Sequence, residues 1–312
     1  MRYEAAVTPA SISPENHRAG TVALVGRPNV GKSTLFNAAL GQNLAIVSPV
    51  PQTTRHRILG VVYRPGAEIA LLDTPGIHKP QSRLGRALNG TARAASRAAD
   101  VLVYVAAPGS ACRVHAGDRT LLADIGAGQP TVLAVNQIDR VTPKARLLPL
   151  LAELSELRDF AAVVPISALT SDGLDRLLDE TSKLLPLAPP HYDADTLTDR
   201  PLRFFAAELV RGSILAATRE EIPHAAAVEI REFEELANLA RITATIHVER
   251  DGQKAILIGR RGEKLKSIGI EARARIEELL EKKVHLSLWV QVTPDWTNSD
   301  SSLAELGYVD DA

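Results

Sequence analysis

Short apolar runs rich in β-branched residues alternate with longer helical stretches from about residue 21 to residue 185. One pair of runs flanks the turn at 64–67 closely enough to form a hairpin, whereas the other runs are separated by enough chain for crossover helices. This order predicts an α/β fold, a doubly wound and mostly parallel sheet with one antiparallel edge. The predicted strands are 21–25, 58–63, 68–72, 101–105, 131–135 and 162–166.

The pattern changes near residue 190. Three prolines, Pro186, Pro189 and Pro190, precede an acidic segment without periodicity, which indicates a linker. The order that follows is helix, two strands, short helix, helix and strand, which predicts a second, smaller α+β domain. The chain then divides into a flexible leader (1–19), an α/β domain (20–186), a linker (187–200), an α+β domain (201–296) and an acidic tail (297–312).

Composition excludes several classes of protein. Of the 312 residues, 45% are hydrophobic, which is enough for two cores and excludes a disordered chain. The formal net charge of −1 gives the whole molecule no attraction to nucleic acid or membrane, so a charged partner requires a local patch. The one cysteine, Cys112, excludes a disulfide scaffold and fits a small core position in a cytoplasmic protein. Apolar runs fall short of the roughly 18 residues of a membrane-spanning helix.

The octet GRPNVGKS at 26–33 follows the first predicted strand and fits the phosphate-loop pattern GxxxxGK(S/T). Its glycines let backbone N–H groups approach phosphates, and the helix that follows adds partial positive charge. Lys32 reaches the β- and γ-phosphates, and the Ser33 hydroxyl binds Mg²⁺. We expect the nucleotide to contact Gly26, Asn29, Val30, Gly31, Lys32, Ser33 and Thr34.

Three further motifs follow predicted strands. DTPG at 73–76 places Asp73 where a carboxylate can hold the magnesium shell, and Gly76 can offer its N–H to the γ-phosphate. NQID at 136–139 and SAL at 167–169 lie where a base would bind. The Asp139 carboxylate can accept two hydrogen bonds that guanine donates and adenine cannot, and the Ala168 amide can meet the guanine O6. The predicted base-binding residues are Asn136, Gln137, Asp139, Ser167, Ala168 and Leu169.

These motifs together resemble the signatures of translation-factor-class small GTPases, and the stretch QTTRHR at 52–57 resembles the Era GTPases in particular. The resemblance implies GTP and GDP as ligands, and it implies that Thr54 closes over Mg²⁺ and the γ-phosphate. The implied metal set is Ser33, Thr54 and Asp73. The implied catalytic set is Lys32, Thr54, Asp73, Gly76 and Asn29.

Two positions bear on the rate of hydrolysis and on affinity. Ile77 follows DTPG, where Ras-like proteins place a glutamine that orients water, so we expect slow intrinsic hydrolysis. In related proteins the residue equivalent to Asn29 helps to hold K⁺, and potassium activation is our hypothesis for this chain. Gln137 stands where the guanine motif usually has lysine, and losing one hydrogen bond would weaken nucleotide binding by about 1 kcal/mol.

The sequence GRRG at 259–262 lies between an apolar segment and a helix, and it resembles the GXXG loop of type II KH domains. Such a loop lets the backbone of single-stranded RNA approach closely, and its arginines supply charge. Residues 250–275 carry eight basic and three acidic side chains, whereas 295–312 carry five acids and no base. The predicted RNA-binding residues are Gly259, Arg260, Arg261, Gly262, Lys264 and Lys266. Ile256, Ile258, Ile268 and Ile270 either line an apolar groove for bases or belong to the ordinary core.

The resemblance covers about residues 20–308 and implies GTP-dependent binding of the 3′ end of 16S rRNA during assembly of the 30S subunit. It also implies a cytoplasmic monomer with peripheral contact to the inner face of the cell membrane. Trp289 and Trp296 resemble the carboxyl end of Era proteins, and we expect both in the core. The arginine-rich helix 82–99 is either an element that shifts on hydrolysis or a static solvated helix.

Other functions fit the motifs less well. A non-catalytic RNA-binding protein that senses nucleotide would explain Ile77, but the complete set of Lys32, Ser33, Thr54 and Asp73 argues for hydrolysis. A kinase could share the phosphate loop, yet it would not need Asn136 and Asp139. A tRNA-modifying GTPase needs a large module before the loop, and a double GTPase needs a second loop.

Overall fold

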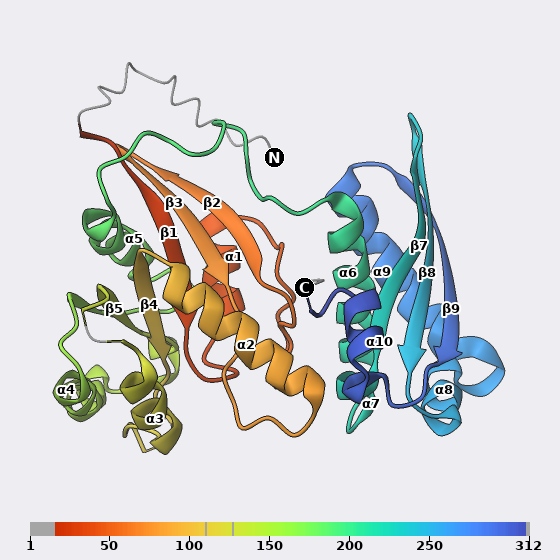
Figure 1. The fold of residues 1–312 in the computed structure, drawn as a ribbon, viewed down its shortest axis with the longest axis horizontal. Helices are drawn as coiled ribbons and strands as arrows, with labels where there is room; N and C mark the ends of the chain where they lie inside the picture. Colours follow the sequence, from red (N-terminus) through yellow and green to blue (C-terminus); the bar gives the residue numbers. More distant parts are fainter. Residues whose placement is uncertain (1–15, 110, 127, 310–312) are drawn as a thin grey trace.

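The computed structural model describes residues 16–309 except 110 and 127. Most of the leader that we predicted to be flexible, 1–19, lies outside this part of the chain. So do the last residues of the acidic tail. Arg18 and Ala19, the last but one and last residues of the predicted leader, begin the first strand. The described residues form two sheets, each with its own helices, that lie side by side (Figure 1).

The first sheet has six strands in the order β2-β3-β1-β4-β5-β6, of which only β2 is antiparallel to its neighbour. This confirms the predicted doubly wound sheet with one antiparallel edge, and all six strands lie where the apolar runs predicted them. The strands are β1 (Arg18–Val25), β2 (Ile58–Arg64), β3 (Ala67–Asp73), β4 (Val101–Ala106), β5 (Thr131–Val135) and β6 (Ala162–Pro165).

Helices cover both faces of this sheet because its central strands are apolar on both sides. Two helices pack on one face around Phe36 and Leu177, and three pack on the other around Leu121 and Leu154. Cys112 is buried in a satellite cluster, as predicted. The helices are α1 (Lys32–Leu40) and α5 (Leu174–Leu184) on the first face, and α2 (Arg83–Ala98), α3 (Ala116–Asp124) and α4 (Leu148–Leu157) on the second.

The second unit is a three-stranded sheet in the order β7-β8-β9, covered on one face by α6 and α9. The predicted order of helices and strands is confirmed, and the structure adds α7 and α10, which the sequence analysis did not predict. The elements are α6 (Leu202–Ala217), α7 (Ile222–Ala225), β7 (Ala227–Glu235), β8 (Leu239–Val248), α8 (Asp251–Ile258), α9 (Glu263–Leu280), β9 (Lys283–Val292) and α10 (Asp300–Glu305).

The segment between the two units lies along the edge strand β2. Leu197 accepts a backbone hydrogen bond from Val61 (2.9 Å), and the Thr198 hydroxyl donates to the Leu59 carbonyl (2.6 Å). Near its start, the amide of His191 donates to the Glu68 carboxylate (2.8 Å). The segment therefore covers polar groups that an edge strand would otherwise expose.

Candidate functional site

The phosphate loop connects β1 to α1, so its N–H groups lie at the amino end of a helix. Gly31 has φ +94°, and a Cβ at this position would lie 2.3 Å from Nδ2 of Asn136, so no other residue fits. The Lys32 amine donates to the carbonyls of Gly26 (3.2 Å) and Arg27 (3.0 Å). Burial lowers the pKa of Lys32 to about 8. A nearby phosphate would favour the charged amine again.

Three predicted metal ligands converge beside this loop. The hydroxyls of Ser33 and Thr54 lie 2.7 Å apart, and both donate to Oδ2 of Asp73, at 2.7 and 3.2 Å. The other oxygen, Oδ1 of Asp73, is buried without a partner, and burial raises the pKa of this carboxyl to about 6. Hydroxyl and carboxylate oxygens are the ligands that Mg²⁺ prefers, and the unpartnered oxygen gives the ion a place. The donor set therefore fits Mg²⁺.

The predicted base-binding residues meet at the carboxyl ends of β5 and β6. The Asn136 side chain donates to the Val30 carbonyl (2.9 Å) and accepts from the Ala168 amide (2.9 Å), so one side chain joins the phosphate loop to the base loop. The Ser167 hydroxyl donates to Oδ1 of Asp139 (2.7 Å), which fixes that exposed carboxylate. Leu169 is 74% exposed. Its side chain can contact only the solvent-facing side of a bound base.

Gln137 and Asn29 fix the outer side of the phosphate loop. The Gln137 side chain donates to the Asn29 carbonyl (3.1 Å), so the glutamine makes a hydrogen bond to the phosphate loop. The Asn29 side chain donates to the Pro49 carbonyl (2.9 Å) and thereby joins the phosphate loop to the segment that carries Thr54. Gly76 lies against Pro28, where a Cβ would come within 2.9 Å of backbone atoms.

The segment that carries Thr54 is anchored to the second unit, a feature that the sequence analysis missed. Arg55 is buried and donates to three carbonyls at the end of α7, those of Pro223 (2.9 Å), His224 (2.8 Å) and Ala226 (2.8 Å). Its guanidinium carbon lies 5.9 Å from the ring centroids of both Trp296 and Tyr308. These contacts fix the residue directly after Thr54.

A second arginine holds the residue before Thr54. Arg211 of α6 donates to the Thr53 carbonyl (2.6 Å) and to both carboxylate oxygens of Glu208. Although burial raises the pKa of Glu208, the Arg211 guanidinium brings it below its ordinary value, so the pair is charged. In the sequence these anchors were indicated by Arg55 of QTTRHR alone. The groups that it binds are backbone carbonyls, which every residue type has, so the sequence cannot identify them.

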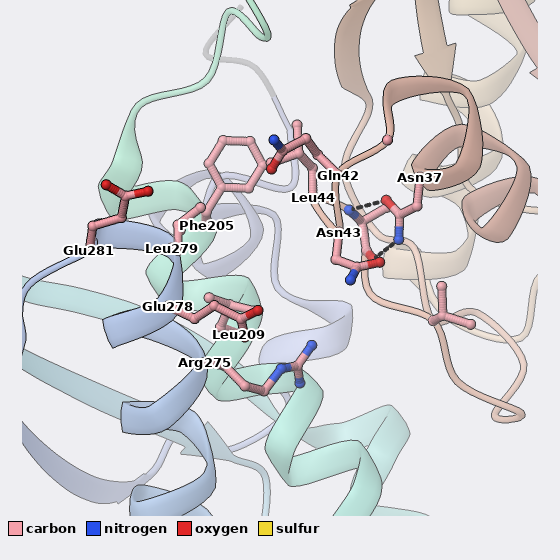
Figure 2. Close-up of a pocket in the computed structure, with 13 residues that line it drawn as sticks. Asn37, Gln42, Asn43, Leu44, Phe205, Leu209, Arg275, Glu278, Leu279 and Glu281 are labelled. Atoms are coloured by element: carbon pink, nitrogen blue, oxygen red, sulfur yellow. Dashed lines mark hydrogen bonds between the residues drawn. The ribbon is translucent and has the colours of Figure 1, made fainter. Parts of the chain in front are cut away.

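A polar groove of about 430 Å³ lies between the two units (Figure 2). The loop after α1 forms one wall, where the Asn37 side chain exchanges two hydrogen bonds with the backbone of Ala45. Phe205 and Arg275 contribute to the opposite wall. The two units are thus in close contact at Arg55 and Arg211 and separated at this groove.

The GRRG loop forms a turn between α8 and α9. Gly259, Arg261 and Gly262 all have positive φ, at +70°, +52° and +79°, and Arg260 and Arg261 are exposed. A Cβ on Gly259 would lie 2.7 Å from Cβ of Lys264, so this glycine is required. Lys266 is exposed on the first turns of α9. The loop backbone and four basic side chains are therefore presented together.

The isoleucines divide between the two roles considered for them, and the expectation for one tryptophan is wrong. Ile268 is fully buried in the core, so it cannot line a groove for bases, whereas Ile256 and Ile270 are half-exposed and remain available. Trp289 is 66% exposed, because it lies on the face of β9 that no helix covers. Trp296 is fully buried, as predicted, and its indole N–H donates to the Ala225 carbonyl (2.9 Å).

Comparison with known proteins agrees with this geometry. Residues 21–137 match the family described as 50S ribosome-binding GTPase, and residues 221–297 match the KH domain family. GTPase Era of Stenotrophomonas maltophilia (strain K279a) is 47% identical over 293 residues, which cover 94% of this chain and 98% of that protein. GTPase Era of Xanthomonas oryzae pv. oryzae (strain MAFF 311018) is 46% identical over 299 residues, which cover 96% and 99%.

Two solved structures resemble 94% of this chain. One is Era in complex with MgGDPNP and nucleotides 1506–1542 of 16S ribosomal RNA, with a TM-score of 0.90 and 38% identity over 94% of this chain and 99% of that one. The other is a variant of Aquifex aeolicus Era bound to GDP and aluminium fluoride, with the same TM-score, identity and coverage. Both sheets and the helices of both units therefore have counterparts in solved structures.

Proposed function

The chain belongs to the Era family of GTPases, and from this premise we propose that it hydrolyses GTP slowly and uses its nucleotide state to control binding of the 3′ end of 16S rRNA during assembly of the 30S subunit. The observation that carries the proposal is the position of Thr54. Its hydroxyl belongs to the metal set with Ser33 and Asp73, and the residues on either side of it are held by the second unit.

The nucleotide site supports binding of GTP and GDP. Lys32 neutralises the phosphates, Asp139 selects guanine, and Asn136 fixes both loops relative to each other. Ser33, Thr54 and Asp73 would hold Mg²⁺, which supplies positive charge between the β- and γ-phosphates when bound. When GTP is bound, the γ-phosphate and Mg²⁺ would add to the contacts of Thr54, and after loss of the γ-phosphate the segment 53–55 would transmit the change to α6 and α7.

The side chain after DTPG, Ile77, does not assist hydrolysis, so the reaction needs a further positive charge or a bound partner. Ile77 has no polar atom with which to orient water, and it packs against the core under α2 and α3. We propose that K⁺, held with the help of Asn29, and bound RNA both accelerate the reaction. Turnover that is equal in potassium and sodium salts would reject the first part, and turnover that is equal with and without RNA would reject the second.

The cellular location and the oligomeric state of the protein are proposed from the resemblance alone. We propose a cytoplasmic monomer that makes peripheral contact with the cell membrane. No helix within 16–309, leaving aside 110 and 127, has the length and hydropathy needed to cross a bilayer. Light scattering of the purified chain and sedimentation with anionic vesicles test these two proposals separately.

The deciding experiment measures GTP hydrolysis and RNA affinity in three proteins. Lys32→Ala should abolish nucleotide binding and hydrolysis, because the phosphates lose their buried cation. The double change Arg260→Asp and Arg261→Asp should abolish RNA binding and RNA stimulation but preserve basal hydrolysis. Aspartate tolerates the left-handed conformation of residue 261, so the loop backbone is preserved. RNA affinity that is equal without nucleotide, with GDP and with a non-hydrolysable GTP analogue would overturn the proposal.

A second candidate is a nucleotide-sensing RNA-binding protein with little or no hydrolysis, which Ile77 favours. It predicts the same dependence of RNA affinity on nucleotide. The two candidates differ in one measurement. If the second is correct, the wild-type protein incubated with GTP, RNA and K⁺ in a single-turnover experiment would release no more phosphate than the Lys32→Ala protein does.

A further inference from the structure

Helix α2 carries four arginines and no acidic residue in its 16 positions. At 100° per residue, Arg83, Arg86, Arg93 and Arg97 fall within an arc of about 80°, opposite the buried residues of the helix. All four side chains are exposed. We call this surface the α2 arginine face. It extends about 21 Å along the helix.

The charges at the amino end of the α2 arginine face do not stabilise the helix, whereas Arg97 lies in the last turn, where the helix dipole favours a basic residue. Arginines three and four positions apart repel one another by a few tenths of a kcal/mol. Arg83 and Arg86 lie in the first turn, where the helix dipole favours acidic residues and none is present. The sequence therefore places positive charge where the helix by itself would be more stable without it.

Neighbouring acids compensate only part of this charge. Arg83 pairs with Asp300 of α10, and Arg93 pairs with Asp124 of α3 (3.1 Å), with all four side chains about half-exposed or more. Arg86 and Arg97 have no ion-pair partner in the part of the chain that the structure describes. Exposed pairs contribute little, so the face keeps a positive field.

The α2 arginine face is continuous with the surroundings of the nucleotide site. A groove of about 720 Å³ lies between the loop after β3, α2 and α3, and its lining includes Arg27, Ile77, Lys79 and His115. At its other end the face reaches the second unit, where the amide of Arg83 donates to the Asn298 side chain (3.1 Å). In Figure 1, α2 crosses in front of the first sheet, and the end that carries Arg83 points toward α10 and α7.

We propose that the α2 arginine face binds the sugar-phosphate backbone of RNA, at a part of the molecule adjacent to the strand that the GRRG loop holds. The inference rests on the proposed function and extends it to a second contact. Arginine suits phosphate because its planar guanidinium donates two parallel hydrogen bonds. The face has no large exposed apolar side chain, which a membrane-binding helix or the centre of a protein interface would need.

The chain offers variants that change the charge of α2 but preserve its fold. The pair Arg86→Gln and Arg97→Gln removes the two unpaired charges and keeps long side chains. Gly90→Glu adds a negative charge in the middle of the face, where a Cβ would meet nothing within 4 Å, and glutamate favours helix more than glycine does. Ser155→Glu adds the same charge on the exposed side of α4 and is the matched control.

The experiment compares two RNA probes in a titration of salt concentration. One probe is the fragment 1506–1542 of 16S rRNA that the Era complex contains, and the other is a short unpaired oligonucleotide from its end. For the long probe, the double arginine variant should bind about tenfold more weakly, and the slope of log K against log salt should fall by about 1.5 to 2. Gly90→Glu should weaken binding of the same probe, and Ser155→Glu should not. Binding of the short probe and hydrolysis without RNA should be unchanged in all of these proteins.

Equal affinities and equal salt slopes for the long probe in the wild type and the double arginine variant would overturn the inference. So would a loss of binding to anionic vesicles with no loss of RNA binding. Failure of the proposed function is distinguishable, because it would appear as unchanged binding of the short probe after the Arg260→Asp and Arg261→Asp change. That result concerns the GRRG loop and leaves the comparison of the α2 variants intact.

Discussion

Asp73 and Lys32 are buried, and without a ligand their burial disfavours the charged form of each side chain. Burial raises the pKa of Asp73 to about 6 and lowers that of Lys32 to about 8, so each charge is destabilised. A divalent cation beside the carboxylate and a phosphate beside the amine would reverse both effects. These residues are therefore arranged for binding, and the apo protein is less stable for it.

Asp73→Asn should separate the effect of this carboxylate on the stability of the apo protein from its effect on ligand binding. The neutral amide keeps an oxygen for the Ser33 and Thr54 hydroxyls, so we expect the free energy of unfolding of the apo protein at pH 7.5 to stay equal or to rise, by up to about 2 kcal/mol. The stabilisation by Mg²⁺ and GDP should be lost. Thermal unfolding with and without Mg²⁺ and GDP measures both. Asp175→Asn, at an exposed carboxylate, is the control. A marked loss of apo stability would contradict this account.

Gln137→Lys should strengthen nucleotide binding. The lysine can still reach the Asn29 carbonyl, and it adds the charge that the usual guanine motif has at this position. We expect GDP to bind about fivefold more tightly, which corresponds to about 1 kcal/mol. Calorimetry with GDP and ADP tests it, and a gain for ADP as large as that for GDP would show that the residue has no part in guanine selection.

Element by element, the sequence predicted the regular structure well, because the strands of the first sheet are short apolar runs separated by longer helical stretches. It did not predict α7 and α10, which have four and six residues and depend on tertiary contacts. Leu303 of α10 and Tyr308 are buried against Leu84 and Leu88 of α2, far away in the sequence. The predicted positions of the nucleotide motifs agree with the geometry because they follow strand ends, whereas the anchors of segment 53–55 involve backbone carbonyls that no motif marks.

Arg55→Gln tests the segment 53–55 as the element that joins the two units. Three buried carbonyls would lose their charged donor, so we expect a loss of about 2 to 4 kcal/mol in stability of the interface. Nucleotide binding should change little, and RNA affinity should no longer differ between GDP and a non-hydrolysable GTP analogue. Fluorescence anisotropy with labelled RNA measures this. Arg57→Gln, at an exposed arginine two residues on, should preserve the difference; if both variants preserve it, the segment does not couple the units.

At the scale of the whole molecule, the interface between the two units contains a histidine that titrates below neutral pH. His56 stacks on Tyr308, with ring centroids 4.8 Å apart, and meets the edge of Phe204 at 5.3 Å. Burial lowers the pKa of His56 from 6.5 to about 4, although Glu208 opposes the shift. The neutral ring is therefore favoured in the folded protein.

Stability should fall as the pH decreases from about 6.5 to about 4, because the unfolded chain binds a proton at His56 that the folded protein excludes. The loss at His56 should reach up to about 3 kcal/mol and should be absent above pH 7. His56→Phe keeps the ring contacts and should reduce this part of the pH dependence. Urea unfolding at pH 5 and pH 7.5 measures it. Equal pH dependence in both proteins would show that other groups account for the loss.

Most of the predicted linker, 187–200, is hydrogen-bonded to the first unit rather than free. Only about three residues then separate the two units, too few to act as a long tether. An RNA that contacts both α2 and the GRRG loop must match a nearly constant separation. RNAs whose two contacting parts are spaced differently would engage one surface at a time and lose the gain in affinity that bivalent binding gives.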